Sequence, residues 1–78
     1  MAKIFAQHAF AGDLHLETRY IKPHQWEWAV LLKGRQRVAD GASETLEGAK
    51  DAAVKAAGLD ARKVDWENIG PALENLPD

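Results

Sequence analysis

The stretch that decides the fold of this chain is residues 26–58, WEWAVLLKGRQRVADGASETLEGAKDAAVKAAG. Its apolar residues first stand at every second position, which is the period of a strand with one buried face: Trp26, Trp28, Val30 and Leu32. Residues 33–36, Lys-Gly-Arg-Gln, then have the composition of a hairpin connection. Residues 37–42 resume a short alternation, so the first half of the stretch predicts an antiparallel hairpin.

The hydrophobic period changes in the second half of this stretch. From residue 46 on, apolar residues recur three or four apart, along one stripe of a helix: Leu46, Ala49, Ala53, Ala56 and Ala57. Ser43 or Thr45 offers a side-chain oxygen to the free N–H groups of the first turn, and Gly58 supplies a left-handed stop. Gly48 is unfavourable inside a helix by about 1 kcal/mol relative to alanine. The alanine stripe predicts close packing on the sheet, with the two tryptophans filling the space opposite it.

One more strand is expected before this stretch. Residues 14–21 alternate between apolar and polar side chains, and Pro23 ends that strand because proline lacks the N–H that a ladder requires. Residues 1–12 fit a strand that turns at Gly12-Asp13, and they fit a short helix almost as well. The sheet therefore has three strands, or four if residues 1–12 add one.

The tail after the helix is expected to fold back on the core. Val64, Trp66 and Ile69 are its apolar anchors, and proline suits the first turn of a short helix from Pro71 to Leu76. No repeat or linker divides the chain, which predicts a single domain over residues 1–78. The predicted class is α+β: a small antiparallel sheet of three or four strands packed on one α-helix, with a short helical C-terminal extension.

Composition restricts the classes of protein to which the chain belongs. With 78 residues and no cysteine, it has neither disulfides nor thiolate metal sites to supplement a small core. The N-terminal residues hold no long apolar run, so no signal peptide, no membrane partner and a cytoplasmic location are expected. The net charge of −2 argues against a simple nucleic-acid binder. Residues 19–37 carry five basic residues and one acidic residue, whereas residues 60–78 carry five acidic and two basic ones.

The sequence offers little for catalysis or for a cofactor. His8, His15 and His24 are spaced by seven and nine residues, which matches neither a helical nor a hairpin metal pair. The one serine and one of the two threonines, Ser43 and Thr45, are already explained as capping residues, and there is no glycine-rich phosphate loop. We therefore predict no catalytic residue, no metal site and no cofactor, and a protein that is not an enzyme.

The remaining candidate site is a surface. If the helix covers the tryptophan face, the opposite face of the sheet carries a mixture of charged and aliphatic residues: His15, Glu17, Arg19, Ile21, Glu27, Leu31, Lys33, Arg37 and Ala39. Such a face can dock a protein, although one side of an antiparallel sheet often simply contacts water. The candidate partner-binding residues are Arg19, Leu31, Lys33, Arg35 and Arg37.

A pattern over residues 26–57 resembles a loose set of small uncharacterised β-hairpin-plus-helix proteins of proteobacteria and their phages. It consists of Trp-x-Trp-x-Val, a basic turn, Val-Ala-x-Gly and Thr-Leu-Glu-x-Ala-Lys, through Trp26, Trp28, Val30, Val38, Gly41, Thr45, Leu46, Glu47, Ala49 and Lys50. The resemblance implies a fold and an origin but no activity. Some phage proteins of this size and build inhibit host defence, anti-CRISPR proteins among them, so the resemblance suggests an accessory or inhibitor protein acting on a host protein.

The same hairpin also resembles plant-type and phage-integrase-type DNA-binding domains, which lay a three-stranded sheet in the major groove. The resemblance implies that Arg19, Lys33, Arg35 and Arg37 contact DNA. The departures are that the strands carry few basic residues, that Glu17 and Glu27 would face phosphates, and that the tail is acidic. Because phosphate neutralisation supplies most non-specific affinity, only weak binding is expected.

The preferred hypothesis is thus a non-catalytic protein-interaction module whose partner is another protein of unknown identity. The alternatives are a weak, sheet-mediated nucleic-acid-binding domain and a structural homodimer. Salt distinguishes the first two, because nucleic-acid affinity falls steeply with ionic strength and an interface centred on apolar contacts does not.

Overall fold

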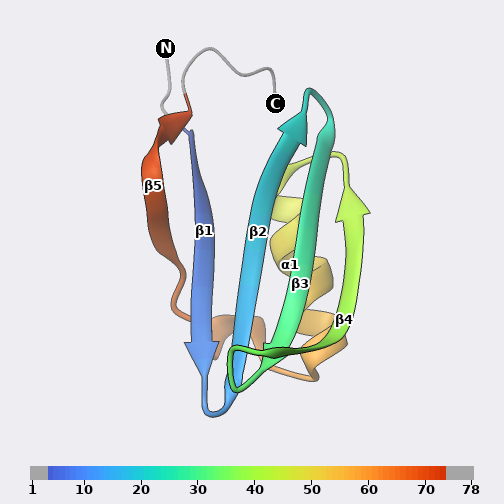
Figure 1. Cartoon of the computed structure of the whole chain (residues 1–78), viewed down its shortest axis with the longest axis vertical. Coiled ribbons are helices and arrows are strands. Elements are labelled where there is room, and N and C mark those ends of the chain that lie inside the picture. Colours follow the sequence, from blue (N-terminus) through green and yellow to red (C-terminus); the bar gives the residue numbers. More distant parts are fainter. Residues whose placement is uncertain (1–3, 74–78) are drawn as a thin grey trace.

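A computed structural model describes residues 4–73 of the chain, with side chains for residues 4–71. Its elements are β1 (Ile4–Ala11), β2 (Leu14–Lys22), β3 (Gln25–Leu32), β4 (Gln36–Ser43), α1 (Leu46–Ala57), a short 3-10 helix (Ala61–Lys63) and β5 (Glu67–Leu73). The strands form one antiparallel sheet in the order β4-β3-β2-β1-β5 (Figure 1). The α+β class is confirmed. The expected number of strands is wrong, because the sheet has five rather than three or four.

The helix α1 packs on β2, β3 and β4 and lies behind these three strands in Figure 1. It begins after Thr45, whose Oγ1 accepts a hydrogen bond from the N–H of Gly48 at 3.0 Å. It ends at Gly58, which adopts the left-handed conformation with φ at 70°. Of the two capping candidates, Thr45 is therefore the cap, and Ser43 is the last residue of β4.

The core places large side chains of the sheet against small side chains of the helix. Leu16, Trp26 and Val30 are fully buried on the sheet, and Ala49 and Ala53 are fully buried on α1. This arrangement agrees with the packing expected from the alanine stripe. Because alanine side chains are small, α1 approaches the sheet closely and buries Trp26, while Trp28 is half-buried.

Two glycines permit close contacts around this core. A Cβ at Gly41 of β4 would lie 2.7 Å from Cζ2 of Trp28, so the indole ring fits only because residue 41 has no side chain. A Cβ at Gly48 would overlap the Oγ of Ser43. The glycine that looked unfavourable inside the helix is thus explained by the close approach of the first turn of α1 to the end of β4.

The strands that come first and last along the chain, β1 and β5, are neighbours in the sheet, which the sequence did not predict. Residues 4–11 are a strand, which resolves the choice between strand and helix. The helix expected from Pro71 to Leu76 is wrong for its first three residues, which belong to β5, and residues 74–76 lie outside the described residues. Pro71 is tolerated because β5 is an edge strand and its register with β1 shifts between Ile4 and Ala6.

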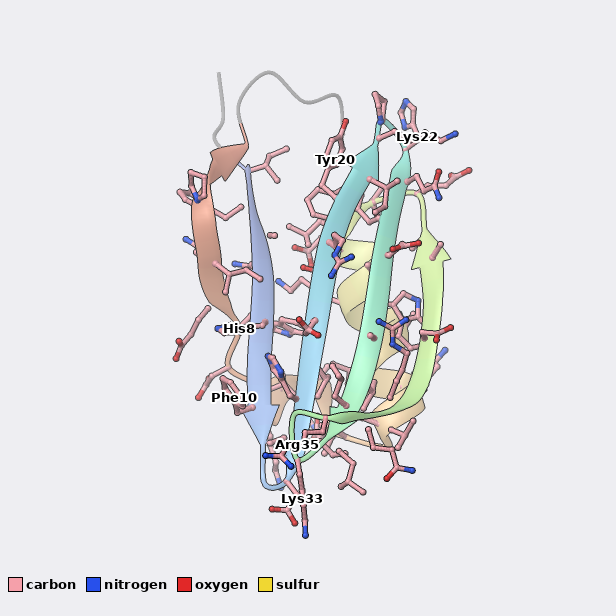
Figure 2. All side chains as sticks on the ribbon, in the orientation of Figure 1. His8, Phe10, Tyr20, Lys22, Lys33 and Arg35 are labelled. Atoms are coloured by element: carbon pink, nitrogen blue, oxygen red, sulfur yellow. The ribbon has the colours of Figure 1, made fainter. Side chains whose placement is uncertain are left out.

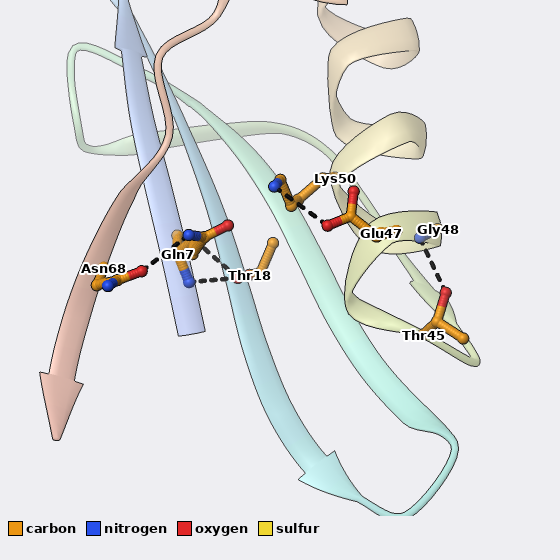
Figure 3. Close-up of polar contacts among 7 residues, drawn as sticks. All are labelled: Gln7, Thr18, Thr45, Glu47, Gly48, Lys50 and Asn68. Carbon is orange, nitrogen blue, oxygen red and sulfur yellow. Dashed lines mark hydrogen bonds and ion pairs between the residues drawn. The ribbon is translucent and has the colours of Figure 1, made fainter. Parts of the chain in front are cut away.

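A polar chain of side-chain contacts joins β2, β1 and β5 (Figure 3). The backbone register of β1 with β2 runs from His8 to Ala11. Beside it, the Oγ1 of Thr18 accepts a hydrogen bond from the N–H of Gln7 at 2.8 Å and donates one to its carbonyl oxygen at 2.7 Å. The Nε2 of Gln7 donates in turn to the Oδ1 of Asn68 at 2.8 Å. Thr18 is only 3% exposed, so a buried side chain makes the hydrogen bonds to the backbone of Gln7 that a strand backbone would otherwise make.

The tail is anchored on the core by two of the three predicted residues. Val64 is buried in the core cluster, and Trp66 packs against that cluster with Lys50 Nζ 5.4 Å from its ring centroid. Ile69 instead lies beside Ala6 in the register of β5 with β1. Within residues 4–73, no helix has both the length and the apolar character needed to cross a lipid bilayer.

Candidate interaction surface

The face of the sheet turned away from α1, here called the open face, is organised in rows of residues that run across the strands. The row nearest the β1–β2 and β3–β4 turns pairs Phe10 with His15, His15 with Leu31 and Leu31 with Arg37. Each of these residues comes from a different strand, from β1 to β4. The register therefore assembles one continuous surface from positions that span much of the chain.

The β1 end of this row is aromatic. The rings of Phe10 and His15 stack with centroids 4.4 Å apart and an interplanar angle of 7°, and the ring of His8 meets Phe10 edge-on at 5.2 Å. Phe10 is nevertheless 64% exposed. Figure 2 shows Phe10 and His8 on β1, close to the turn end of the sheet. An aromatic side chain held by stacking and left open to solvent is typical of a binding anchor.

The other end of the row is basic. Lys33 and Arg35 lie in the β3–β4 turn, both exposed, and Figure 2 shows them at the end of the molecule. The backbone N–H of Lys33 donates to the carbonyl oxygen of Asp13 at 2.7 Å, which ties the β3–β4 turn to the β1–β2 turn. The two turns thus form one joined support for the basic side chains.

A second row, with three acidic residues, crosses the middle of the open face. It runs from β5 to β4 in direct register and contains Glu67, His8, Glu17, Ala29 and Asp40. Its centre is a shallow hollow of about 300 Å³ whose lining includes Ala29 and Asp40. Asp40 also forms an ion pair with Arg37 at 3.6 Å, both side chains being more than half exposed. At such exposure the pair contributes little to stability.

The structure gathers four of the five predicted binding residues. Leu31 and Arg37 are direct neighbours in the row nearest the turns, and Lys33 and Arg35 extend the same end. Arg19 is not part of this group, because it pairs with Glu27 on the far side of the acidic row. Arg19 lies four positions along β2 from His15, which is the β2 residue beside Leu31, and four steps of strand span about 13 Å.

One residue expected on the open face lies on the other side. Ala39 packs against the core cluster beneath α1, although Arg37 remains on the open face. The reason is a bulge: the register of β3 with β4 shifts between Val30 and Leu31, which adds Val38 to β4 and reverses the alternation beyond it. Simple alternation from Arg37 cannot predict this reversal.

Sequence reasoning missed the aromatic cluster. The spacing of His8 and His15 indicates no hairpin pair, but the structure places His8 Nδ1 3.1 Å from His15 Nε2. The missing signal was the register: a strand over residues 4–11 that turns at Gly12-Asp13 sets His8, Phe10 and His15 on one face, with His8 and His15 diagonal to one another. The expected position of His15, opposite the face of Leu14 and Leu16, is confirmed by its pairing with Leu31.

Among residues 4–73, no group of three or more histidine and carboxylate side chains is placed to hold a metal ion. No family model matches the chain, and searches of curated proteins and of solved structures found no significant match. The function of the protein is therefore inferred from the chemistry of the open face.

Proposed function

We propose that this protein is a non-catalytic interaction module that binds another protein through the turn end of its open face. The surface, here called the tip surface, consists of Phe10, His15, Leu31, Lys33, Arg35 and Arg37. The observation that carries the proposal is the exposure of Phe10, 64%, on a face that the helix leaves free. An exposed aromatic ring beside an aliphatic side chain and flexible cations is the composition that protein interfaces favour.

The charges of the tip surface indicate the chemistry of the partner. Lys33 and Arg35 are exposed cations in the β3–β4 turn, whereas Arg37 is already paired with Asp40. A partner that presents carboxylates around an apolar side chain would satisfy both the cations and Phe10. Such complementarity speeds encounter and selects the partner, while the apolar centre supplies the affinity.

The acidic row argues against nucleic acid as the partner. A strand of DNA or RNA laid across the open face would place its phosphates over Glu17, Asp40 and Glu67, since these residues share one row. The cations of the open face are divided by this row, with Arg19 on one side and the basic turn on the other, so they form no continuous phosphate track. A host protein, as the resemblance to phage accessory proteins suggests, is the partner that we propose.

The test is a capture experiment with variants of the tip surface. We expect the immobilised protein to retain a binding partner from a nuclease-treated proteobacterial lysate, and expect Phe10→Ala and Arg35→Ala each to lose it. Ile21→Ala is the matched control, because Ile21 is also an exposed hydrophobic residue, 42% exposed, near the opposite end of β2. All variants should unfold at the urea concentration of the parent protein, since none of the three residues is buried.

Three results would contradict the proposal. Equal capture by the two tip variants would mean that the partner binds elsewhere. Capture from an untreated lysate but not from the nuclease-treated one, together with a steep fall of affinity with salt, would favour the nucleic-acid alternative. A doubled mass in solution that Phe10→Ala halves would assign the tip surface to a homodimer instead.

A further inference from the structure

The strand register brings two imidazole rings together on the open face. His8 Nδ1 lies 3.1 Å from His15 Nε2, with ring centroids 5.1 Å apart and an interplanar angle of 67°. The pair is diagonal: His8 faces Glu17 across the β1–β2 ladder, and His15 faces Phe10. From this geometry we infer that His8 and His15 chelate one divalent transition-metal ion, of the Zn²⁺, Ni²⁺ or Cu²⁺ class.

The separation of the two nitrogens is close to that of a chelate. Zinc–nitrogen bonds of about 2.0–2.1 Å at a tetrahedral angle place the two ligand nitrogens about 3.3 Å apart. Neutral imidazole is a preferred ligand of zinc, copper and nickel. The observed 3.1 Å is therefore close to the separation that a shared ion requires.

The surroundings hold the pair in place before any ion arrives. His8 and His15 lie on the two strands of a tight hairpin, and the ring of Phe10 stacks on His15 with an interplanar angle of 7°. A ligand set that is already ordered loses little conformational entropy on binding. The stacked phenyl ring also has the effect of fixing the plane in which the Nε2 lone pair of His15 points.

Charge favours a cation at this position. His8 is flanked in its row by two carboxylates, Glu17 on β2 and Glu67 on β5. Negative charge on the two neighbouring strands lowers the electrostatic free energy of a divalent cation bound there. Neither strand supplies a third ligand in the arrangement described, so water completes the coordination and the ion exchanges readily.

Without metal, the same distance describes a hydrogen bond in which one ring donates to the other. The two states have nearly the same nitrogen–nitrogen distance, so a titration with metal is needed to distinguish a chelating pair from a merely hydrogen-bonded one. We expect tag-free protein in a non-chelating buffer to bind one Zn²⁺ per chain by isothermal titration calorimetry, and to bind no Mg²⁺, which prefers oxygen ligands.

Variants assign the ion to the pair. Loss of a partner in the outer shell alone costs about 10- to 100-fold in metal affinity, so His8→Gln and His15→Gln should each weaken Zn²⁺ binding at least about tenfold. His24→Asn is the matched control, since His24 is the third histidine, exposed in the β2–β3 turn, and asparagine suits its positive φ of 64°. We expect His24→Asn to bind as the parent does.

Amide spectra provide a second measurement. Zn²⁺ should shift the resonances of residues 7–9 and 14–16 and leave those of the β2–β3 turn unchanged. Absence of Zn²⁺ binding to the parent chain, or equal affinity in His8→Gln and His15→Gln, would overturn the inference. The inference of a metal site does not depend on the proposed function, because Arg35→Ala should abolish partner capture and leave Zn²⁺ affinity unchanged.

Discussion

The three strands beneath α1 and the two outer strands are held in different ways. β2, β3 and β4 pack their inner face directly on the helix. β1 and β5 are held by the β1–β2 ladder, by the hydroxyl of Thr18, by the small buried Ala9 of β1 and by the packing of Val64 and Trp66 against the core cluster. One sheet can therefore contain regions of two different local stabilities. The outer strands should open at a lower free energy than the strands beneath the helix.

This difference affects function, because the tip surface and the histidine pair each include residues from both regions. Phe10 and His8 belong to the outer pair, while His15 and the basic turn belong to the covered strands. A loosening of β1 would separate the two halves of the tip surface and the two nitrogens of the histidine pair together.

The largest effect is expected at the residue that both regions share. Leu16 is fully buried and pairs with Ala9 on β1 and Val30 on β3. Leu16→Ala should lower the free energy of unfolding by about 2–5 kcal/mol, because it leaves a cavity in the core. Urea denaturation gives the value. Amide exchange should accelerate in both regions alike, and acceleration limited to β1 and β5 would contradict a shared core.

A selective effect is expected at Thr18. In Thr18→Val the N–H and carbonyl groups of Gln7 lose their partner, at a cost of about 1–3 kcal/mol. Amide exchange should accelerate in β1 and β5 much more than in β3, since the hydroxyl links only the outer strands to the rest. Thr18→Ser is the matched control, because serine keeps the hydroxyl. Uniform acceleration across the sheet would break the distinction between the two regions.

The smallest effect is expected at the cap of α1. Thr45→Ala removes the acceptor for the N–H of Gly48 and should cost about 1 kcal/mol, with faster amide exchange in the first turn of the helix. Thr45→Ser should retain most of the stability. If Thr45→Ala also accelerated exchange in β5, the outer pair would depend on the helix more than the contacts indicate.

Local chemistry predicted the covered region well. The two-residue period from Trp26 to Leu32, the glycine turn and the helix from residue 46 to Gly58 are properties of short segments, and the structure has each of them. The outer pair was harder to predict. β5 exists because β1 offers it a free edge, and no local pattern in Gly70-Pro71 indicates a strand.

The candidate site shows the same division. The basic residues Lys33 and Arg35 were predicted from a single turn. The aromatic cluster needs the register of β1 with β2, which was open as long as residues 1–12 fitted a helix almost as well as a strand. Ala39 was misplaced for a related reason, since its face is set by the bulge at Val38, and Arg19, although on the expected face, lies away from the other candidates because cross-strand pairing sets its neighbours. Long-range register, rather than composition, decides which side chains meet.

The two edge strands also affect how molecules of this protein meet at high concentration. An edge strand with a regular row of free N–H and carbonyl groups is a template on which another strand can grow into a fibril. Here β5 carries Pro71, which has no N–H, beside an irregular register, and β4 bulges at Val38. Neither edge offers an incoming strand an unbroken row, so the sheet should end at five strands instead of propagating from one molecule to the next.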